Sequence, residues 1–450
     1  MYNILQLLQR IGFLCLFVFF QEVRLSTLLK AERDNVSSRV SQSCQKDDSN
    51  NAPINEQEIG RIAQTLGQAY DQNGIQGVLN ACDQEMSAIS TTANIPYLVR
   101  DIHKNFSSSN QRRTITGIIN GMMGWGCRCS TTIDQSTLED TLFCWKLLDA
   151  VDNSHLSCWK PDIVTLSLAY TGVADSHPPE ASAILARAKQ LRRGDSEKEE
   201  KENITLNMPD AKNKELSSEH GFHILYDHAD FFILNKPSGV SLPEIERVLR
   251  HHDIPLSDLN PDGSRGLVHR LDVGTSGCLI LAKTNAMHAQ LISQFFLRQV
   301  EKSYLALVAC DNPKHGSSNK LPSSGIIDLS IDGRPSISYY EKMQTDDATS
   351  SSSLRPPKAT ILRIRTQQGR KHQVRIHCSK GLQRPILLDP LYGGQRIMYA
   401  INSNAMKQAR AKRQFCLHAD ELSIPKWGVH VTAPMPLWWE QIIQDVEKIQ

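Results

Sequence analysis

The stretch 192–220 of this 450-residue chain constrains the fold most, because it cannot take part in a hydrophobic core. It reads RRGDSEKEEKENITLNMPDAKNKELSSEH, with many charges and no aromatic residue. A segment of this composition buries too little apolar surface to offset the entropy lost on folding. The whole chain also exceeds the length of about 250–300 residues at which single cores stop growing. We therefore predict a charged linker over 192–220 between two structured regions.

The region before this linker is expected to be all-helical. Apolar residues recur at helical spacing over 56–191, and strand-like alternation is scarce. Two segments there resemble each other, each with one helix followed by an amphipathic second helix: TITGIINGMMGWGC with TLEDTLFCWKLLDAV, and PDIVTLSLAYTGVA with PPEASAILARAKQL. Such hairpins are similar to pentatricopeptide repeats, which stack and bind single-stranded RNA. A generic helical bundle is the alternative.

After the linker, residues 221–445 change to a pattern of short strands. HILY and FFILN predict a hairpin, and CLILAK, EKSYLALVA and ATILRIRT predict further strands. Thr284 caps a predicted helix whose apolar side carries Met287 and Leu291. Hairpins with a few helices, without regular β-α-β order, indicate an α+β domain with a mixed, mostly antiparallel sheet.

The net charge of +2 neither requires nor excludes a nucleic-acid partner. Two segments are strongly basic, however: 363–384 contains no acid, and KQARAKR follows at 407–413. Solvated faces are the common explanation for such runs, and a phosphate-binding surface is the alternative.

The N-terminal segment 1–30 carries an apolar core over 11–20 that is too short to span a bilayer comfortably. It resembles the apolar part of a signal peptide, and the lack of acids before Glu22 also fits an organellar presequence. We expect a targeting segment, with a mitochondrion or plastid favoured over the cytoplasm, and no stable membrane insertion.

The 11 cysteines are scattered and odd in number, which indicates reduced thiols. The spacing around Cys127 and Cys129 lacks the paired C-x2-C arrangement that wraps a tetrahedral zinc ion. We predict no metal site.

One carboxylate stands out in the second region. In GLVHRLDVGTSGCLILAK, Asp272 follows Arg270 and precedes Thr275 and Ser276, whose hydroxyls can donate hydrogen bonds to a carboxylate. An Asx turn that satisfies its own backbone is one interpretation. The other is a lone carboxylate, held ionised by an arginine, that acts as a nucleophile or base.

Four motifs in order, NKPSGVS, VHRLDVGTSG, EKSYLAL and GRKHQVRIH, are similar to those of RluA-type pseudouridine synthases over about 222–438. The resemblance implies an isomerase that cuts the N-glycosidic bond of a uridine in rRNA or tRNA, turns the uracil and joins it to the same ribose by carbon. It also implies that no metal and no cofactor are needed. We expect a monomer.

By this resemblance Asp272 is the catalytic aspartate, Tyr304 packs on the uracil and is a candidate acceptor of its C5 proton, and Arg375 pairs with Asp272. A β-strand core aromatic is the alternative for Tyr304. An opposite charge within about 4–6 Å would keep the carboxylate ionised. The residues expected around the substrate are Arg270, which helps to hold the extruded uridine, and His269, Lys236, Arg370 and His372. For His269 and Lys236 a structural role is the stronger interpretation.

The chain departs from the family pattern at Leu388, where the family usually has a glycine before the aspartate of LLDPLYGG. Two other functions compete with isomerisation. One is an RNA-binding or chaperone protein without turnover on the same scaffold. The other is a glycosidic hydrolase, which usually needs two carboxylates flanking the bond.

Overall fold

The computed structural model describes residues 56–89, 95–106, 112–130, 143–153, 161–191, 221–309, 321–343, 359–394 and 403–447. The predicted targeting segment 1–30 and the predicted linker 192–220 lie outside these ranges. The chain divides into two compact units, Met1–Lys160 and Pro161–Gln450. No helix in the described ranges is long and apolar enough to cross a bilayer.

The described part of the first unit is helical, as predicted. It contains α2 (Glu56–Ile89), α3 (Ile95–Phe106), α4 (Arg112–Ser130) and α5 (Phe143–Asn153). Helix α2 bends at Gly74, whose φ of 60° is left-handed and suits a residue without a Cβ atom. Arg61 bonds Glu85 at 2.6 Å, which ties the two halves of α2 together. The core of this unit lies among these four helices.

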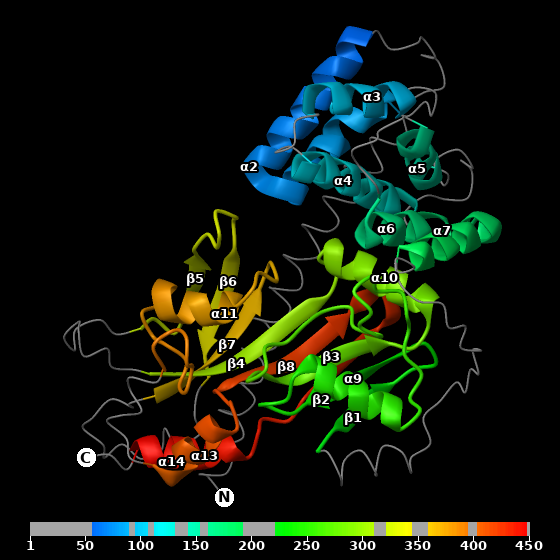
Figure 1. Cartoon of the computed structure of the whole chain (residues 1–450). Coiled ribbons are helices and arrows are strands. Elements are labelled where there is room, and N and C mark those ends of the chain that lie inside the picture. The colour runs from blue at the N-terminus through cyan, green and yellow to red at the C-terminus, as the bar shows by residue number, and fades with distance from the viewer. Residues whose placement is uncertain are drawn as a thin grey trace, which may run out of the picture. The chain divides into compact units, whose positions relative to one another are not determined.

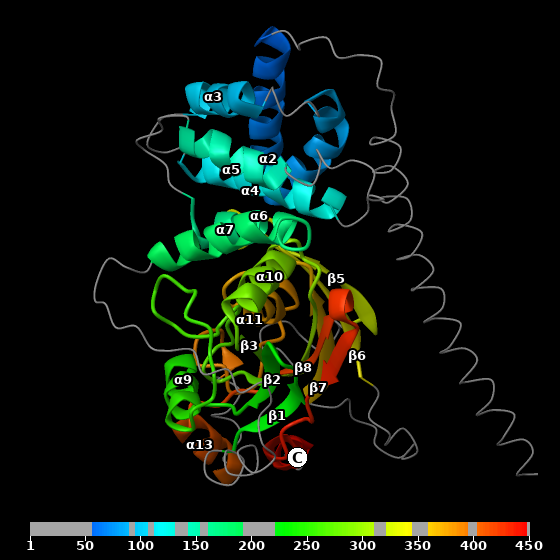
Figure 2. The ribbon, with the colours of Figure 1, turned by 90° about the vertical axis from the view of Figure 1, so that its right-hand side faces the viewer.

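The second unit begins with a helical hairpin, α6 (Ile163–Val173) and α7 (Pro178–Gln190). Asp162 caps α6 by accepting a hydrogen bond from the Thr165 amide at 2.8 Å. Nearly all of α6 is buried, because it lies between α7 and α10 (Asn285–Phe296). Figures 1 and 2 both show α6 beside α10, and the Thr171 hydroxyl donates to the Ser293 hydroxyl at 2.8 Å.

The boundary between the units therefore differs from the predicted one at 192–220. An apolar α6 needs cover all round, and α10 of the strand-rich region supplies it. The two predicted repeat hairpins fall in different units, so their likeness to pentatricopeptide repeats stays a prediction.

The second unit is built on a mixed sheet, which confirms the α+β prediction. Its strands are β1 (His223–Asp227), β2 (Phe231–Lys236), β3 (Ser276–Ala282), β4 (Glu301–Ala309), β5 (Ser324–Asp328), β6 (Ile337–Lys342), β7 (Ala359–Thr366), β8 (Leu417–Ile424) and β9 (Val429–Thr432). They pair in the order β1-β2-β3-β8-β4-β7-β6-β5, with β9 beside β8. Among the described strands only β3 and β8 pair in parallel.

Two helices cover opposite faces of the sheet at β2 and β3. Alternate residues of β2 divide between them: Phe231 packs with Leu291 of α10, and Phe232 packs with Ile245 of α9 (Leu242–His251). Thr284 caps α10, as the sequence predicts, by accepting from the Met287 amide. Helices α13 (Asn404–Ala411) and α14 (Trp438–Glu447) contact each other farther along the chain.

We predict that the α6–α7 hairpin is needed for the stability of the second unit. A chain that begins at residue 221 should unfold at a lower temperature than one that begins at residue 161. The free energies of unfolding of the two chains should differ by more than about 2 kcal/mol, because burial of one leucine side chain contributes about 1.5–3 kcal/mol and α6 buries both Leu166 and Leu168. Thermal and urea unfolding of the two truncated chains measure this, and equal curves would contradict it.

Candidate active site

Hydrogen bonds from the Lys236 side chain hold the loop that carries Asp272. The Lys236 ammonium is fully buried and donates to three carbonyl oxygens, those of Pro237 at 2.9 Å, Val273 at 2.9 Å and Thr275 at 2.8 Å. Burial lowers the pKa of Lys236 to about 7. Lys236 was predicted near the substrate, but its contacts fit the structural interpretation, because all three acceptors are backbone atoms.

Two glycines let this loop approach strand β8. A Cβ atom on Gly274 would lie 2.2 Å from the ring of Phe415, and one on Gly277 would lie 2.1 Å from the Ala419 carbonyl oxygen. Gly277 also has a φ of 107°, which a side chain would strain. The loop therefore lies against the residues that lead into β8.

The Asp272 carboxylate is not used for an Asx turn. The Thr275 amide donates to the Asp272 main-chain oxygen at 3.0 Å, and Arg375 Nη1 donates to Asp272 Oδ2 at 2.8 Å. The Ser276 hydroxyl forms a hydrogen bond with His418 Nδ1 at 2.9 Å. The prediction that this hydroxyl donates to the Asp272 carboxylate is therefore wrong. The side chain of Asp272 is 27% exposed, which leaves it open to a ligand.

Arg375 is fixed by a second carboxylate. Its Nε and Nη2 atoms donate to Asp389 Oδ2 and Oδ1, both at 2.8 Å, and Asp389 is fully buried. The Phe415 ring lies 4.5 Å from the guanidinium carbon and the Tyr392 ring lies 5.1 Å from it. A forked pair with Asp389 thus leaves one nitrogen of Arg375 to meet Asp272.

Burial lowers the pKa of Arg375, but hydrogen bonds and charge from Asp389 and then Asp272 outweigh it, so the pKa is raised overall. Arg375 lies in α11 (Gln373–Ile376), which continues as a π-helical turn, η5 (His377–Gly381). A π-helical turn is a form of helix that often occurs at functional sites.

The charge of Asp272 acts on both Tyr304 and His372. Burial, and next the charge of Asp272, raise the pKa of Tyr304, so its phenol stays neutral at neutral pH. His372 Nε2 lies 3.5 Å from Asp272 Oδ1, and its Nδ1 pairs with the Tyr392 hydroxyl at 2.9 Å. Burial is the main cause of the lowered pKa of His372.

Three predicted residues occupy the margin of the site. His269 Nε2 accepts from the Ile280 amide at 3.0 Å, and its ring stacks on Phe295 at 4.9 Å. Burial, together with the charge of Lys302, lowers the pKa of His269 to about 3, so the ring is a neutral structural element. The Arg270 side chain is exposed. The main-chain amide of Arg370 donates a hydrogen bond to Gln373 Oε1 at 3.0 Å.

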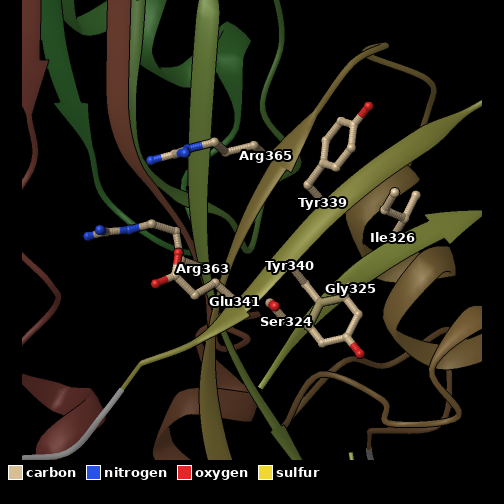
Figure 3. A pocket seen from close by; sticks show the side chains of 8 residues that line it. All are labelled: Ser324, Gly325, Ile326, Tyr339, Tyr340, Glu341, Arg363 and Arg365. Atoms are coloured by element: carbon tan, nitrogen blue, oxygen red, sulfur yellow. The ribbon is translucent and has the colours of Figure 1, made fainter. Parts of the chain in front are cut away.

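A pocket of about 270 Å³ lies away from Asp272 on strands β5, β6 and β7. Figure 3 shows its side chains, which are Ser324, Gly325, Ile326, Tyr339, Tyr340, Glu341, Arg363 and Arg365. On β7, Arg363 and Arg365 alternate with buried Leu362 and Ile364, and Ile364 pairs with Tyr304 of β4. The two arginines therefore point to the face opposite Tyr304.

Comparisons with known proteins agree with the four motifs. The family model for RNA pseudouridylate synthase matches residues 230–380. Residues 230–380 are an RNA pseudouridylate synthase domain. The chain thus carries an isomerase domain that acts on RNA.

The similarity to whole proteins extends over more residues than the family match. The chain is 28% identical over 247 residues to ribosomal large subunit pseudouridine synthase D of Xylella fastidiosa, covering 51% of this chain and 70% of the relative. It is 32% identical over 226 residues to ribosomal large subunit pseudouridine synthase C of Haemophilus ducreyi, covering 47% and 65%. The solved structure of human RNA pseudouridylate synthase domain containing 4 aligns with a TM-score of 0.38 at 22% identity, covering 52% of this chain and 97% of that one.

Sequence reasoning about the synthase domain gave no role to Asp389. Its only sign in the sequence is a single acid after three apolar residues, Ile386 to Leu388, in a segment whose family pattern contains an aspartate. Leu388 beside it is buried and has a φ of 69°. A left-handed backbone explains why a glycine suits this position, since a side chain there costs about 1–2 kcal/mol.

We predict that Asp389 matters more for stability than Asp272, although both bind Arg375. Asp389→Asn should lower the free energy of unfolding by about 3–5 kcal/mol, because it breaks a buried ion pair from one side. Asp272→Asn should cost about 1 kcal/mol or less, because that carboxylate is partly exposed and Arg375 keeps Asp389. Urea unfolding of both variants measures this, and equal losses would refute the ranking.

We also predict opposite preferences at two adjacent buried leucines. Leu388 has a positive φ, so the free energy of unfolding of Leu388→Gly should equal that of Leu388→Ala or exceed it by about 1 kcal/mol. Leu387 does not have a positive φ, so Leu387→Ala should have a free energy of unfolding about 0.4–1 kcal/mol higher than Leu387→Gly. The free energies of unfolding of the four variants give the comparison, and the same sign at both positions would contradict strain at Leu388.

Proposed function

We propose that this chain converts a uridine of ribosomal RNA into pseudouridine, with Asp272 as the catalytic carboxylate. The observation that carries the proposal is the pairing of a partly exposed Asp272 with an Arg375 that is itself locked by buried Asp389. A carboxylate so placed is oriented, accessible and next to a permanent positive charge, which are the properties a nucleophile or base needs.

The proposed reaction balances without any co-reactant. The bond from the ribose C1′ atom to N1 of uracil breaks, the uracil turns, and a new bond joins C1′ to C5. A proton leaves C5 and N1 gains one, so nothing is released. Asp272 begins the reaction either by attacking C1′ or by removing a ribose proton, and both routes start from the ionised carboxylate.

Tyr304 is assigned to packing against the uracil. Its pKa is raised by burial and by Asp272, so a phenolate that could accept the C5 proton is disfavoured. A neutral ring in this place can still stack on a base, and stacking of this kind contributes about 1–3 kcal/mol per base.

Arg270 is assigned to holding the extruded uridine. It is exposed and lies two residues before Asp272, where it can replace contacts that the base loses on leaving its stack. His372 and Arg370 lie just before the first residue of α11, and we propose that they contact the RNA next to the target.

Ribosomal RNA is favoured as the substrate because both curated relatives named above are ribosomal large subunit synthases. Transfer RNA is the alternative. The location predicted from 1–30 is a mitochondrion or plastid, and with that location the RNA would belong to the ribosome of that organelle.

A glycosidic hydrolase fits this site less well. It needs two carboxylates that can both reach the scissile bond. Asp389 is the second carboxylate nearest to the Asp272–Arg375 pair along their hydrogen bonds, and it is fully buried and forked to Arg375. Asp389 therefore cannot activate water at a bond held by Asp272. Release of free uracil in an activity assay would support hydrolysis.

We predict that Asp272→Asn lowers pseudouridine formation by more than about a hundredfold, the low end of what a positioned acid–base group contributes. RNA affinity should stay within about threefold of wild type, because the side-chain volume is kept. Pseudouridine is mapped across total and organellar RNA from cells that lack the protein and are complemented with each variant, which also identifies the RNA.

Glu440→Gln is the matched control, because it removes one exposed carboxylate from α14. It should restore every site that the wild type restores. Restoration by Asp272→Asn would remove the aspartate from the chemistry, and an unchanged map in cells lacking the protein would favour an RNA-binding protein without turnover.

A further inference from the structure

We infer that Tyr392 is a positioning residue for Asp272, because its hydroxyl fixes the His372 ring and its own ring covers the Arg375 guanidinium. It would thus act on two side chains that meet the Asp272 carboxylate. Tyr392 lies in LLDPLYGG, outside the four motifs that suggest the family. The inference rests on the proposed function, since it names a residue that serves the same carboxylate.

The two oxygens of Asp272 meet different partners. Arg375 Nη1 donates to Oδ2 at 2.8 Å, and His372 Nε2 lies 3.5 Å from Oδ1. The second distance is longer than the about 2.7–3.2 Å of an ordinary hydrogen bond, so this contact is mainly electrostatic. Contacts of catalytic groups often tighten only when the substrate is bound. The orientation of the His372 ring therefore decides what the Oδ1 atom meets.

Tyr392 contacts both of these partners. Its hydroxyl lies 2.9 Å from His372 Nδ1, and the two rings meet edge to face with their centres 5.7 Å apart. The centre of the Tyr392 ring also lies 5.1 Å from the guanidinium carbon of Arg375, within the range of a cation–π contact. One aromatic side chain thus contacts the residue at each oxygen of Asp272.

Tyr392 is itself held by the buried end of this network. Its amide donates to Asp389 Oδ1 at 3.2 Å, and its carbonyl oxygen accepts from the Ser379 hydroxyl at 2.7 Å. Asp389 Oδ1 also accepts from Arg375 Nη2 at 2.8 Å. The same carboxylate therefore fixes the Tyr392 main chain and the Arg375 guanidinium, which keeps the ring and the cation in a constant relation.

His372 has a backbone that needs support of this kind. It precedes α11 with a left-handed φ of 56°. Such a conformation is costly for a residue with a side chain, and it persists where surrounding contacts impose it, often at functional sites. The hydrogen bond with Tyr392 is one contact that fixes the ring on this backbone.

The hydrogen bond between Tyr392 and His372 has two possible forms, because a neutral imidazole has one N–H and one bare nitrogen. In one form the Tyr392 hydroxyl donates to Nδ1, and the Nε2–H faces Asp272. In the other form Nδ1–H donates to the hydroxyl oxygen, and the lone pair of Nε2 faces the carboxylate. Electrostatics favours the first form, since it sets an N–H against an anion. Tyr392 then holds His372 in the tautomer that suits Asp272.

The charges around His372 are consistent with a neutral ring. Burial is the main cause of its lowered pKa, and the charges of Arg375 and Lys371 act in the same direction. The charges of Asp272 and Asp389 oppose this shift without reversing it. A neutral ring has its proton on one nitrogen only, so the partner of the other nitrogen selects the tautomer.

The first test reads this tautomer without any RNA. In the full-length chain with isotope-labelled histidine, nitrogen NMR distinguishes a protonated ring nitrogen from a bare one, and His372→Gln identifies the His372 signals. The wild type should carry the proton on Nε2. Tyr392→Phe should give a mixture of both tautomers, because the donor to Nδ1 is lost. A proton on Nδ1 in the wild type, or unchanged signals in Tyr392→Phe, would overturn the inference.

The second test is the rate of pseudouridine formation on the RNA that the pseudouridine map identifies. Tyr392→Phe should lower kcat by about tenfold, the equivalent of one hydrogen bond, and should leave KM nearly unchanged. Tyr392→Leu should lower kcat further, because it also removes the ring over Arg375. A change in KM alone would make Tyr392 an RNA contact and would overturn its role as a positioning residue.

Tyr339→Phe is the matched control for the loss of a phenol hydroxyl. Tyr339 is 42% exposed on β6, in the pocket that lies away from Asp272 (Figure 3). This variant should keep the wild-type kcat and the wild-type His372 signals. An equal loss of kcat in Tyr339→Phe and Tyr392→Phe would contradict a specific role for Tyr392.

Thermal unfolding separates positioning from a structural role. Tyr392→Phe should melt close to the wild type, because the ring and both main-chain hydrogen bonds of Tyr392 remain. A lower melting temperature with an unchanged kcat would make the hydroxyl structural and would overturn the inference.

The NMR and rate measurements also distinguish this inference from the proposed function. An unchanged kcat in Tyr392→Phe, in a protein whose wild type modifies RNA, would refute the positioning role alone. Histidine signals that change as expected, in a protein that leaves all RNA unmodified, would support the hold of Tyr392 on His372 and refute the isomerase proposal.

Discussion

The buried guanidinium of Arg375, shared between two carboxylates, is the interaction on which the rest of the site depends. Asp389 takes two of its nitrogens from the inside, and Asp272 takes the third at the surface. The Asp389–Arg375 pair holds the guanidinium in place because it is buried. The Asp272 carboxylate is not needed for this and can be partly exposed. Stability and accessibility are thus divided between two acids of the same type, which one aspartate could not provide.

Much of the second unit follows from local sequence patterns. The apolar run FFILN predicts β2, the alternation in ATILRIRT predicts β7, and Thr284 predicts the start of α10, because these signals depend on near neighbours only. The site is predicted in part, since Asp272, Tyr304 and Arg375 are carried by motifs. Asp389 depends on contacts between distant segments, so no spacing in the sequence reveals its buried fork with Arg375.

The division of the chain could not be predicted for a similar reason. A polar segment at 192–220 marks a stretch unable to build a core, but it does not say which regions on either side pack together. That depends on α6, an apolar helix whose cover is α10, more than a hundred residues later. The composition of α6 shows that it needs burial, and only the folded structure shows where it finds it.

The position of 192–220 within the second unit has a consequence for what a cut in this stretch would do. The stretch leaves α7 and returns at β1, and both ends are anchored in the same compact body. A peptide-bond cleavage there would leave two fragments still held by the packing of α6 on α10. The two fragments would separate only if the apolar α6 lost the cover that α10 gives it.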